Sequence, residues 1–155
     1  MNPDVSHYAI LTAMLTPAFF LTATASLLIS ANSRLARVID RARVLLRELP
    51  DLPEDDRMQH EALIALQRRR SLIILRGSQL LYVAISFFVG TSLAVAGDAF
   101  LGYRASGLPT ALAALGVTSM FAASLLLARE AALAVSAVND EMDQGHRLAR
   151  RGRGD

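Results

Sequence analysis

Three long runs of the chain, residues 5–33, 77–97 and 105–128, contain no Asp, Glu, Lys or Arg. A helix needs about 20 apolar residues, each adding about 1.5 Å, to cross ~30 Å of hydrocarbon. Each run is long enough, so we predict three transmembrane helices at about residues 8–31, 77–97 and 108–128. The expected fold class is an all-α membrane protein in which residues 1–155 form a single membrane domain.

The segment between the first two runs, residues 34–76, has the period of a helix. Its first arm repeats apolar residues at steps of three and four, namely Leu35, Val38, Ile39, Ala42, Leu45, Leu46 and Leu49. Pro50 and Pro53 indicate a turn, and Pro53 is suited to open a second helix. The second arm is expected to pack against the first through an apolar face made of Met58, Ala62, Ala65 and Leu66. No helix breaker separates either arm from its neighbouring span, so we expect a cytoplasmic helical hairpin continuous with both spans.

The third span is expected to continue past Arg129 into a helix and tail over residues 129–155. A glycine after the last periodic residue commonly ends a helix, and Gly145 stands at that place. We therefore predict that this helix stops at Gly145 and that a polar tail follows it.

The arginines indicate how the chain is oriented. Residues 34–76 carry ten arginines, residues 98–104 carry one, and the residues before the first span carry none. Loops rich in Lys and Arg stay in the cytoplasm, so the hairpin and the C-terminus are expected inside and the N-terminus outside. The pI near 9.7 follows from these flanking arginines and gives no reason to expect a nucleic-acid partner.

One stretch of the sequence is similar to a known family. It begins with Leu15-Thr16-Pro17-Ala18 and contains the Asn-x-Arg-x-x-Arg element made by Asn32, Arg34 and Arg37. This pattern resembles bacterial three-span membrane proteins catalogued as a domain of unknown function, family 2721. The resemblance continues through Gln67-Arg68-Arg69-Arg70 to Ala128-Arg129-Glu130 and covers most of the chain. It implies the three-span topology in a bacterial inner membrane, and it implies no reaction.

Small and polar residues form one stripe along the first helix. The stripe contains Thr12, Thr16, Phe19, Ala23, Ser26, Ser30, Ser33, Arg37 and Asp40. In one interpretation, the hydroxyls of Thr12, Thr16, Ser26, Ser30 and Ser33 line a polar pore. In the other, the stripe lets helices pack closely, because small residues allow backbones to approach. Three helices cannot enclose a pore alone, so the first interpretation requires a homo-oligomer, and small residues also recur along the other two spans.

Four charged residues follow this stripe at the cytoplasmic end, namely Arg34, Arg37, Asp40 and Arg41. Arginines three or four residues apart on a helix repel one another, so we expect acidic groups close to them. The chain offers carboxylates for this purpose, among them Asp40, Glu48 and Glu130. Anionic lipid headgroups are the other source, worth ~1 kcal/mol per basic residue. The four residues are therefore interpreted as a charged pore vestibule or as contacts for lipid headgroups.

Signals for an enzyme are weak. The chain has no cysteine, and His60-Glu61 lacks the second histidine of a metalloprotease helix because Ile64 stands at that position. We therefore expect no catalytic activity, no cofactor and no metal. Two functions stay open: an ion-conducting homo-oligomeric channel, or a non-conducting scaffold or adaptor. The scaffold would bind a cytoplasmic partner or anionic lipid through its arginine-rich hairpin.

Overall fold

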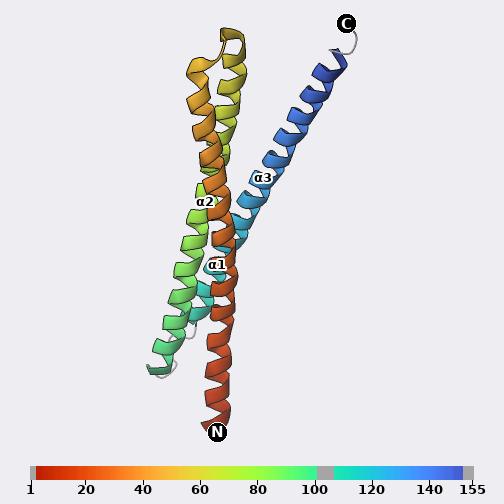
Figure 1. Cartoon of the computed structure of the whole chain (residues 1–155). Coiled ribbons are helices and arrows are strands. Elements are labelled where there is room, and N and C mark those ends of the chain that lie inside the picture. The colour runs from red at the N-terminus through yellow and green to blue at the C-terminus, as the bar shows by residue number, and fades with distance from the viewer. Residues whose placement is uncertain (1–2, 101–106, 152–155) are drawn as a thin grey trace.

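The computed structural model describes residues 3–100 and 107–151, which form three long helices (Figure 1). They are α1 (Pro3–Glu48), α2 (Glu54–Phe100) and α3 (Gly107–Arg151), and the short 3-10 helix η1 (Leu49–Asp51) joins the first two. Their lengths of 46, 47 and 45 residues correspond to about 70 Å each, more than twice the ~30 Å hydrocarbon core. Each helix therefore has room to span a membrane and to project beyond it.

The predicted continuity of the hairpin arms with the spans is confirmed, because α1 and α2 each run unbroken from the membrane segment to the turn. The turn also forms as expected. The carbonyl of Pro53 accepts a 3.1 Å hydrogen bond from the amide of Asp56, and α2 begins at Glu54.

The predicted end of the third helix at Gly145 is wrong, because α3 continues to Arg151. One glycine inside a helix costs about 1 kcal/mol relative to alanine. The next five residues, His146 to Arg150, include Arg147, Leu148 and Ala149, which favour a helix. A glycine ends a helix where the following residues cannot continue it, and here they can.

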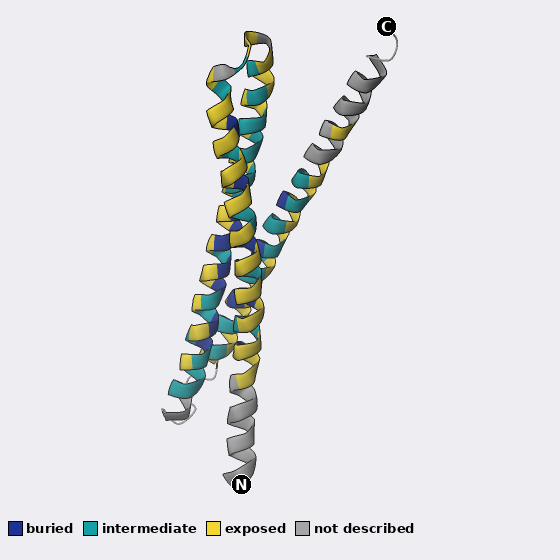
Figure 2. Cartoon of the chain, in the orientation of Figure 1, coloured by how far each residue is buried: buried dark blue, intermediate teal, exposed yellow. Residues whose placement is uncertain are grey.

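Helices α1 and α2 pack along a seam with a period of seven residues. On α1 the buried residues are Pro17, Thr24, Ala31, Val38 and Leu45, and on α2 the series Ile74, Leu81 and Phe88 has the same spacing. A seven-residue period is typical of left-handed coiled coils, in which side chains of one helix fill gaps between those of the other. Figure 2 shows these buried positions as dark patches that follow the helices. The seam runs from the membrane segment into the hairpin.

This seam corrects the expected apolar face of the second hairpin arm. Met58, Ala62 and Ala65 are exposed, and Leu66 is half-buried. The half-buried positions continue the period of seven backwards from Ile74, through Gln67 to His60. Polar residues therefore occupy places on the packed side. Sequence periodicity missed them because it follows hydrophobic residues alone.

In the membrane segment, Phe88 of α2 joins all three helices. Its ring stacks on Phe20 of α1, with centroids 5.1 Å apart and planes inclined by 11°. The same ring lies against Gly116 of α3, where an added Cβ would come within 2.7 Å of it. The hydroxyl of Thr24 on α1 donates a 2.6 Å hydrogen bond to the carbonyl of Phe20 and lies 3.4 Å from the sulfur of Met120 on α3. A glycine at position 116 is thus what lets α3 dock against the aromatic pair.

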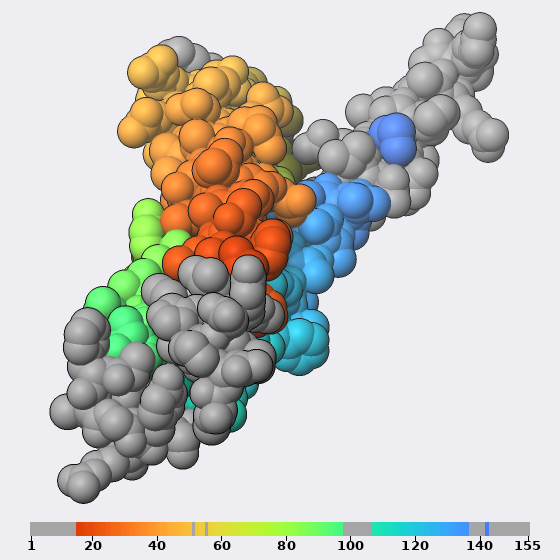
Figure 3. All heavy atoms as spheres, turned by 90° about the horizontal axis from the view of Figure 1, so that it is seen from below, coloured from red at the N-terminus to blue at the C-terminus, as the bar shows by residue number. Residues whose placement is uncertain are grey.

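Beyond this core, α3 leaves the bundle. It packs mainly on α2 and contacts α1 little. Its C-terminal part diverges from the hairpin in Figure 1, and in Figure 3 the coloured part of α3, cyan to blue, extends away from the orange and yellow hairpin. No more than 22% of each most apolar segment is buried within the chain, so most of the apolar surface faces outward. Lipid is the solvent that such a surface requires, and the chain is an all-α membrane protein with three spanning helices.

Candidate anion-binding junction

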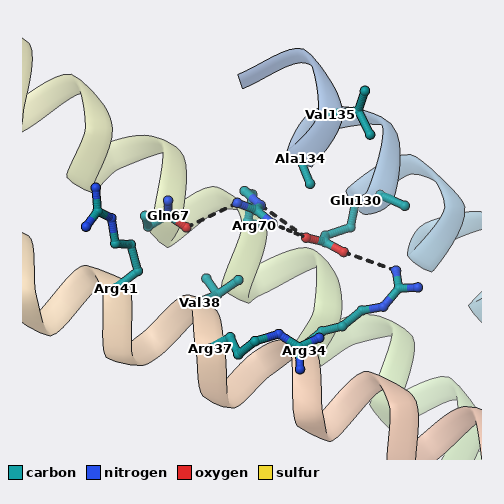
Figure 4. A pocket seen from close by; sticks show the side chains of 10 residues that line it. Arg34, Arg37, Val38, Arg41, Gln67, Arg70, Glu130, Ala134 and Val135 are labelled. Atoms are coloured by element: carbon teal, nitrogen blue, oxygen red, sulfur yellow. Dashed lines mark hydrogen bonds and ion pairs between the residues drawn. The ribbon is translucent and has the colours of Figure 1, made fainter. Parts of the chain in front are cut away.

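Glu130 is a buried carboxylate at the point where the three helices separate. It lies on α3 two residues beyond the uncharged run of the third span, and its side chain is 2% exposed. A charged carboxylate is costly to bury unless cations and hydrogen bonds compensate it. Arginines from the other two helices supply both, so Glu130 connects α3 to α1 and to α2 (Figure 4).

The two arginines bind Glu130 unequally. Arg70 of α2 donates from Nη2 and Nε to Oε1, at 2.8 and 3.1 Å, and its side chain is 17% exposed. Arg34 of α1 lies 3.5 Å from Oε2 and is 39% exposed. Gln67 holds Arg70 in place by accepting a 3.4 Å hydrogen bond from Nη1. Short bonds in a buried place are the stronger ones, so Arg70 is the main partner of Glu130.

A cavity of about 450 Å³, here called the junction cavity, opens beside this cluster (Figure 4). Its charged lining is Arg34, Arg37, Arg41, Arg70 and Glu130, which places four positive charges against one negative charge. Figure 4 shows that Arg34, Arg37 and Arg41 all extend from α1 and that Gln67 and Arg70 extend from α2. The single carboxylate is already shared by Arg34 and Arg70. The cavity therefore presents an excess of positive charge suited to an anion.

The junction cavity continues towards the membrane as a smaller, mostly apolar one. This second cavity, of about 140 Å³, lies between α1 and α3. Its lining includes Leu27, Leu127 and Ala128, and it shares Arg34 and Ala131 with the junction cavity. The cleft is thus basic in its outer part and apolar in its inner part.

Arginines also line the opposite side of α3. A cavity of about 730 Å³ between α2 and α3 is lined by Arg69, Arg76 and Arg129, together with apolar side chains such as Leu126 and Leu133. No acidic residue belongs to this described lining. Both sides of α3 are therefore basic at the level where the helix leaves the membrane segment.

The structure places the predicted stripe of α1 away from the packed seam. Thr16, Ser26, Ser30 and Ser33 are exposed, whereas Thr12 lies outside the residues whose side chains are described. Ser26 and Ser33 donate 3.0 Å hydrogen bonds to carbonyls one turn earlier on their own helix. The hydroxyl residues of the stripe that the structure describes therefore lie outside the packed seam of the chain, and whether they meet a pore or a neighbouring chain stays a prediction.

The four charged candidates at the end of the stripe separate into two groups. Arg34, Arg37 and Arg41 line the junction cavity. Asp40 does not belong to that lining and lies 3.6 Å from Arg43 in an exposed pair. Of the two sources of acidic groups, internal carboxylates and lipid headgroups, the chain itself supplies one for Arg34, through Glu130, and one for Arg43, through Asp40.

Arg70 and Gln67 were missed as site residues by the sequence analysis. Arg70 looked like one of three adjacent boundary arginines, Arg68 to Arg70, and only its rotation around α2 distinguishes it. A signal was present in the seven-residue spacing from Gln67 to Ile74 and Leu81, which places Gln67 on the packed side. Among the residues that the structure describes, no group of three or more His, Asp or Glu could hold a metal ion.

Comparison with known proteins gives one match. No curated protein and no solved structure matches the chain. A family model described as "Protein of unknown function (DUF2721)" matches residues 14–140. The matched range includes the whole α1–α2 seam, both arginines that bind Glu130, and Glu130 itself. Because the match covers far more than half of the sequence, this three-span membrane protein belongs to the DUF2721 family.

Proposed function

We propose that this protein is a non-catalytic, non-conducting membrane scaffold that binds the phosphate group of an anionic lipid in its junction cavity. The observation that carries the proposal is the charge imbalance of the lining, four arginines around one carboxylate that two of them already share. No ion pair joins Arg37 or Arg41 to another described side chain, so both are available. Guanidinium groups bind phosphate oxygens in pairs, which suits them to this ligand.

The shape of the cleft supports a lipid as the source of the phosphate. A headgroup would lie among Arg34, Arg37 and Arg41, and an acyl chain would follow the apolar part lined by Leu27 and Leu127. The second basic cavity, with Arg69, Arg76 and Arg129, offers further contacts on the other side of α3. Under the positive-inside rule both cavities face the cytoplasmic leaflet of a bacterial inner membrane, with the N-terminus outside and the C-terminus inside. Such a leaflet attracts basic clusters when it contains anionic lipids.

A second candidate function, an ion-conducting homo-oligomer, is supported by the outward-facing stripe of α1. Thr16, Ser26, Ser30 and Ser33 are exposed together along one face. Around a symmetry axis this face would line a polar path, with Arg37 and Asp40 at its cytoplasmic mouth. Phe19 belongs to the same face and is 72% exposed, a bulky apolar group that a water-filled path disfavours. The lipid-binding scaffold is therefore the better supported of the two functions.

The test compares lipid binding by two double variants that remove the same charge. In phosphatidylcholine nanodiscs with a trace of spin-labelled phosphatidylglycerol, Arg37→Gln with Arg41→Gln should weaken the preference for the anionic lipid by about 30-fold. This estimate takes ~1 kcal/mol for each of two arginines and a factor of ten for each 1.4 kcal/mol. The matched control, Arg43→Gln with Arg47→Gln, removes arginines outside the cavity lining and should change the preference little.

Further measurements on the same samples separate the alternatives. Competition by free glycerol phosphate at micromolar concentration would assign the site to a soluble anion instead of a lipid. An equal loss of preference in both double variants would reveal general electrostatic attraction and contradict a specific site. Ion flux through vesicles that contain the wild-type chain, with no preference for anionic lipid, would favour the channel.

A further inference from the structure

The acceptor side chains of the junction cavity are already occupied by arginines of the same chain. Only Glu130 and Gln67 carry side-chain acceptors in the described lining, because arginine has N–H donors and no acceptor. Arg70 donates to Oε1 of Glu130 at 2.8 Å and to Oε1 of Gln67 at 3.4 Å. Arg34 lies 3.5 Å from Oε2 of Glu130. A ligand in this cavity therefore meets hydrogen-bond donors, and each acceptor oxygen of the lining faces a guanidinium group.

The donors that remain for a ligand belong to the arginines of α1. Arg70 of α2 uses all three of its guanidinium nitrogens on neighbouring side chains. Arg34 uses only Nη1 on Glu130, and its side chain is 39% exposed. No ion pair joins Arg37 or Arg41 to another side chain that the structure describes. Three arginines with available donors thus line the cavity.

These three arginines form a row on one face of α1. Positions 34, 37 and 41 are separated by three and then four residues, which makes them neighbours on a helix surface. The row extends over seven residues, about 10 Å along the helix. All three side chains extend from α1 and line the same cavity (Figure 4). Such a row suits a ligand that offers several anionic oxygens from one small group.

Anionic lipids differ in how well they match a surface of this kind. A phosphate monoester, as in phosphatidate, has three terminal oxygens and a charge of about −1.5 to −2 at neutral pH. A phosphate diester, as in phosphatidylglycerol, has two terminal oxygens, a single negative charge and an alcohol whose hydroxyls also donate. Those hydroxyl hydrogens would find no unoccupied acceptor side chain in the described lining. The lining therefore suits the monoester better than the diester.

The geometry points to a lipid phosphate monoester, of the phosphatidate class, as the ligand of the junction cavity. This inference rests on the proposed lipid-binding function and specifies its headgroup. The three terminal oxygens pair with Arg34, Arg37 and Arg41, while Arg70 continues to neutralise Glu130. The acyl chain follows the smaller apolar cavity between α1 and α3.

The test compares phosphatidate with phosphatidylglycerol, each carrying the same spin label on its acyl chain, in phosphatidylcholine nanodiscs. At about pH 7.5 we expect the monoester to be preferred about fivefold, which corresponds to one more arginine contact at ~1 kcal/mol. At about pH 5 this ratio should fall close to one. The second pKa of a phosphate monoester is about 6, so below it the monoester carries a single charge, as the diester does.

The ratio between the two lipids isolates the titration of the ligand from that of the protein. The charged groups that face the ligand are the three arginines of α1, Arg70 of α2 and Glu130 of α3. The arginines stay protonated at both pH values. A change in the charge of Glu130 would alter the binding of both lipids in the same direction.

Two single variants that remove the same charge locate the contact. Arg37→Gln should lower the ratio at about pH 7.5 from about fivefold to about one, because the third oxygen then has no arginine. Arg47→Gln changes an exposed position of α1 outside the cavity lining and should leave the ratio unchanged. Arg37 is exposed and has no ion pair with a described side chain, so Arg37→Gln should fold normally, which its melting temperature checks.

The results also separate this inference from the proposed function. Equal binding of the two lipids, both weakened by Arg37→Gln with Arg41→Gln, would leave anionic-lipid binding in place and overturn the preference for a monoester. An equal loss of the ratio in Arg47→Gln would overturn it too, since it would reflect general attraction. Displacement of phosphatidate by micromolar glycerol phosphate would keep the monoester and exclude the lipid as its source. Binding of neither lipid would remove the proposed function together with this inference.

Discussion

Among the charged side chains that the structure describes, Glu130 has the largest role in holding the three helices together. It is 2% exposed, and it contacts guanidinium groups from both other helices. The exposed pairs of the hairpin, such as Arg43 with Asp40, are bonds of a different kind, because water screens them and they contribute about 0–1 kcal/mol. The buried pair of Arg70 with Glu130 is therefore expected to contribute more to stability than the exposed pairs of the hairpin.

Removal of Arg70 should therefore be far more costly than removal of Arg34. Arg70→Ala leaves a buried carboxylate without its main partner, which typically costs about 3–5 kcal/mol. Arg34→Ala removes a half-exposed partner at 3.5 Å, for which we expect about 1 kcal/mol. The free energy of unfolding in mixed micelles measures both changes. Arg43→Ala serves as the control, and similar losses for Arg70→Ala and Arg43→Ala would contradict the importance of the buried pair.

At the scale of the elements, the helices were the most predictable feature. The uncharged runs and the spacing of apolar residues indicated three helices, and the run of α1 into the hairpin followed from the lack of a breaker. Which side of a helix is packed was less predictable. Met58 and Ala65 look like core residues in the sequence yet are exposed, whereas Gln67 lies on the packed side. A helix has a period that sequence reveals, but its rotation depends on the surface of the neighbouring helix.

The docking of α3 on α2 depends on a glycine that the small-residue stripes did not identify. Gly116→Ala should destabilise the protein by about 1–3 kcal/mol, because the new methyl group would meet the ring of Phe88 at 2.7 Å. Gly97→Ala is the matched control, since nothing lies within 4 Å of its added Cβ, and alanine favours a helix. Thermal unfolding followed by circular dichroism distinguishes the two. Equal behaviour of both variants would show that the aromatic pair does not constrain α3.

At the scale of the whole molecule, the distribution of arginines along the sequence determines the expected orientation in the membrane. The packing of the helices determines which of these arginines line a common cavity. Ten arginines lie in residues 34–76, which indicates the side of the membrane on which the hairpin lies. Their grouping into a cavity depends on α3, which contributes Glu130, Ala131 and Ala134 to the lining. The cavity proposed to bind an anion is thus a property of three helices together.

The orientation can be tested with single cysteines in the cysteine-free chain. Met58→Cys, at a position that is 81% exposed on the hairpin, should react with an impermeant maleimide only after the cytoplasmic side is opened. Asn2→Cys and Ser106→Cys should react in intact cells, because the positive-inside rule places both outside. Labelling of Met58→Cys in intact cells would reverse the proposed topology and would place the basic cavities on the outer leaflet.

The sequence by itself determined the helical class, the three spans, the hairpin turn and the resemblance to the family, because each depends on local composition and spacing. It did not indicate that Arg70 rather than Arg68 or Arg69 binds Glu130, or that Gly116 faces Phe88. The tertiary structure decided these points, since they depend on how each helix is rotated and where its neighbours lie. Solvation by lipid is a property of a stretch of sequence, whereas a contact across 60 residues, such as that from Arg70 to Glu130, exists only once the helices have packed.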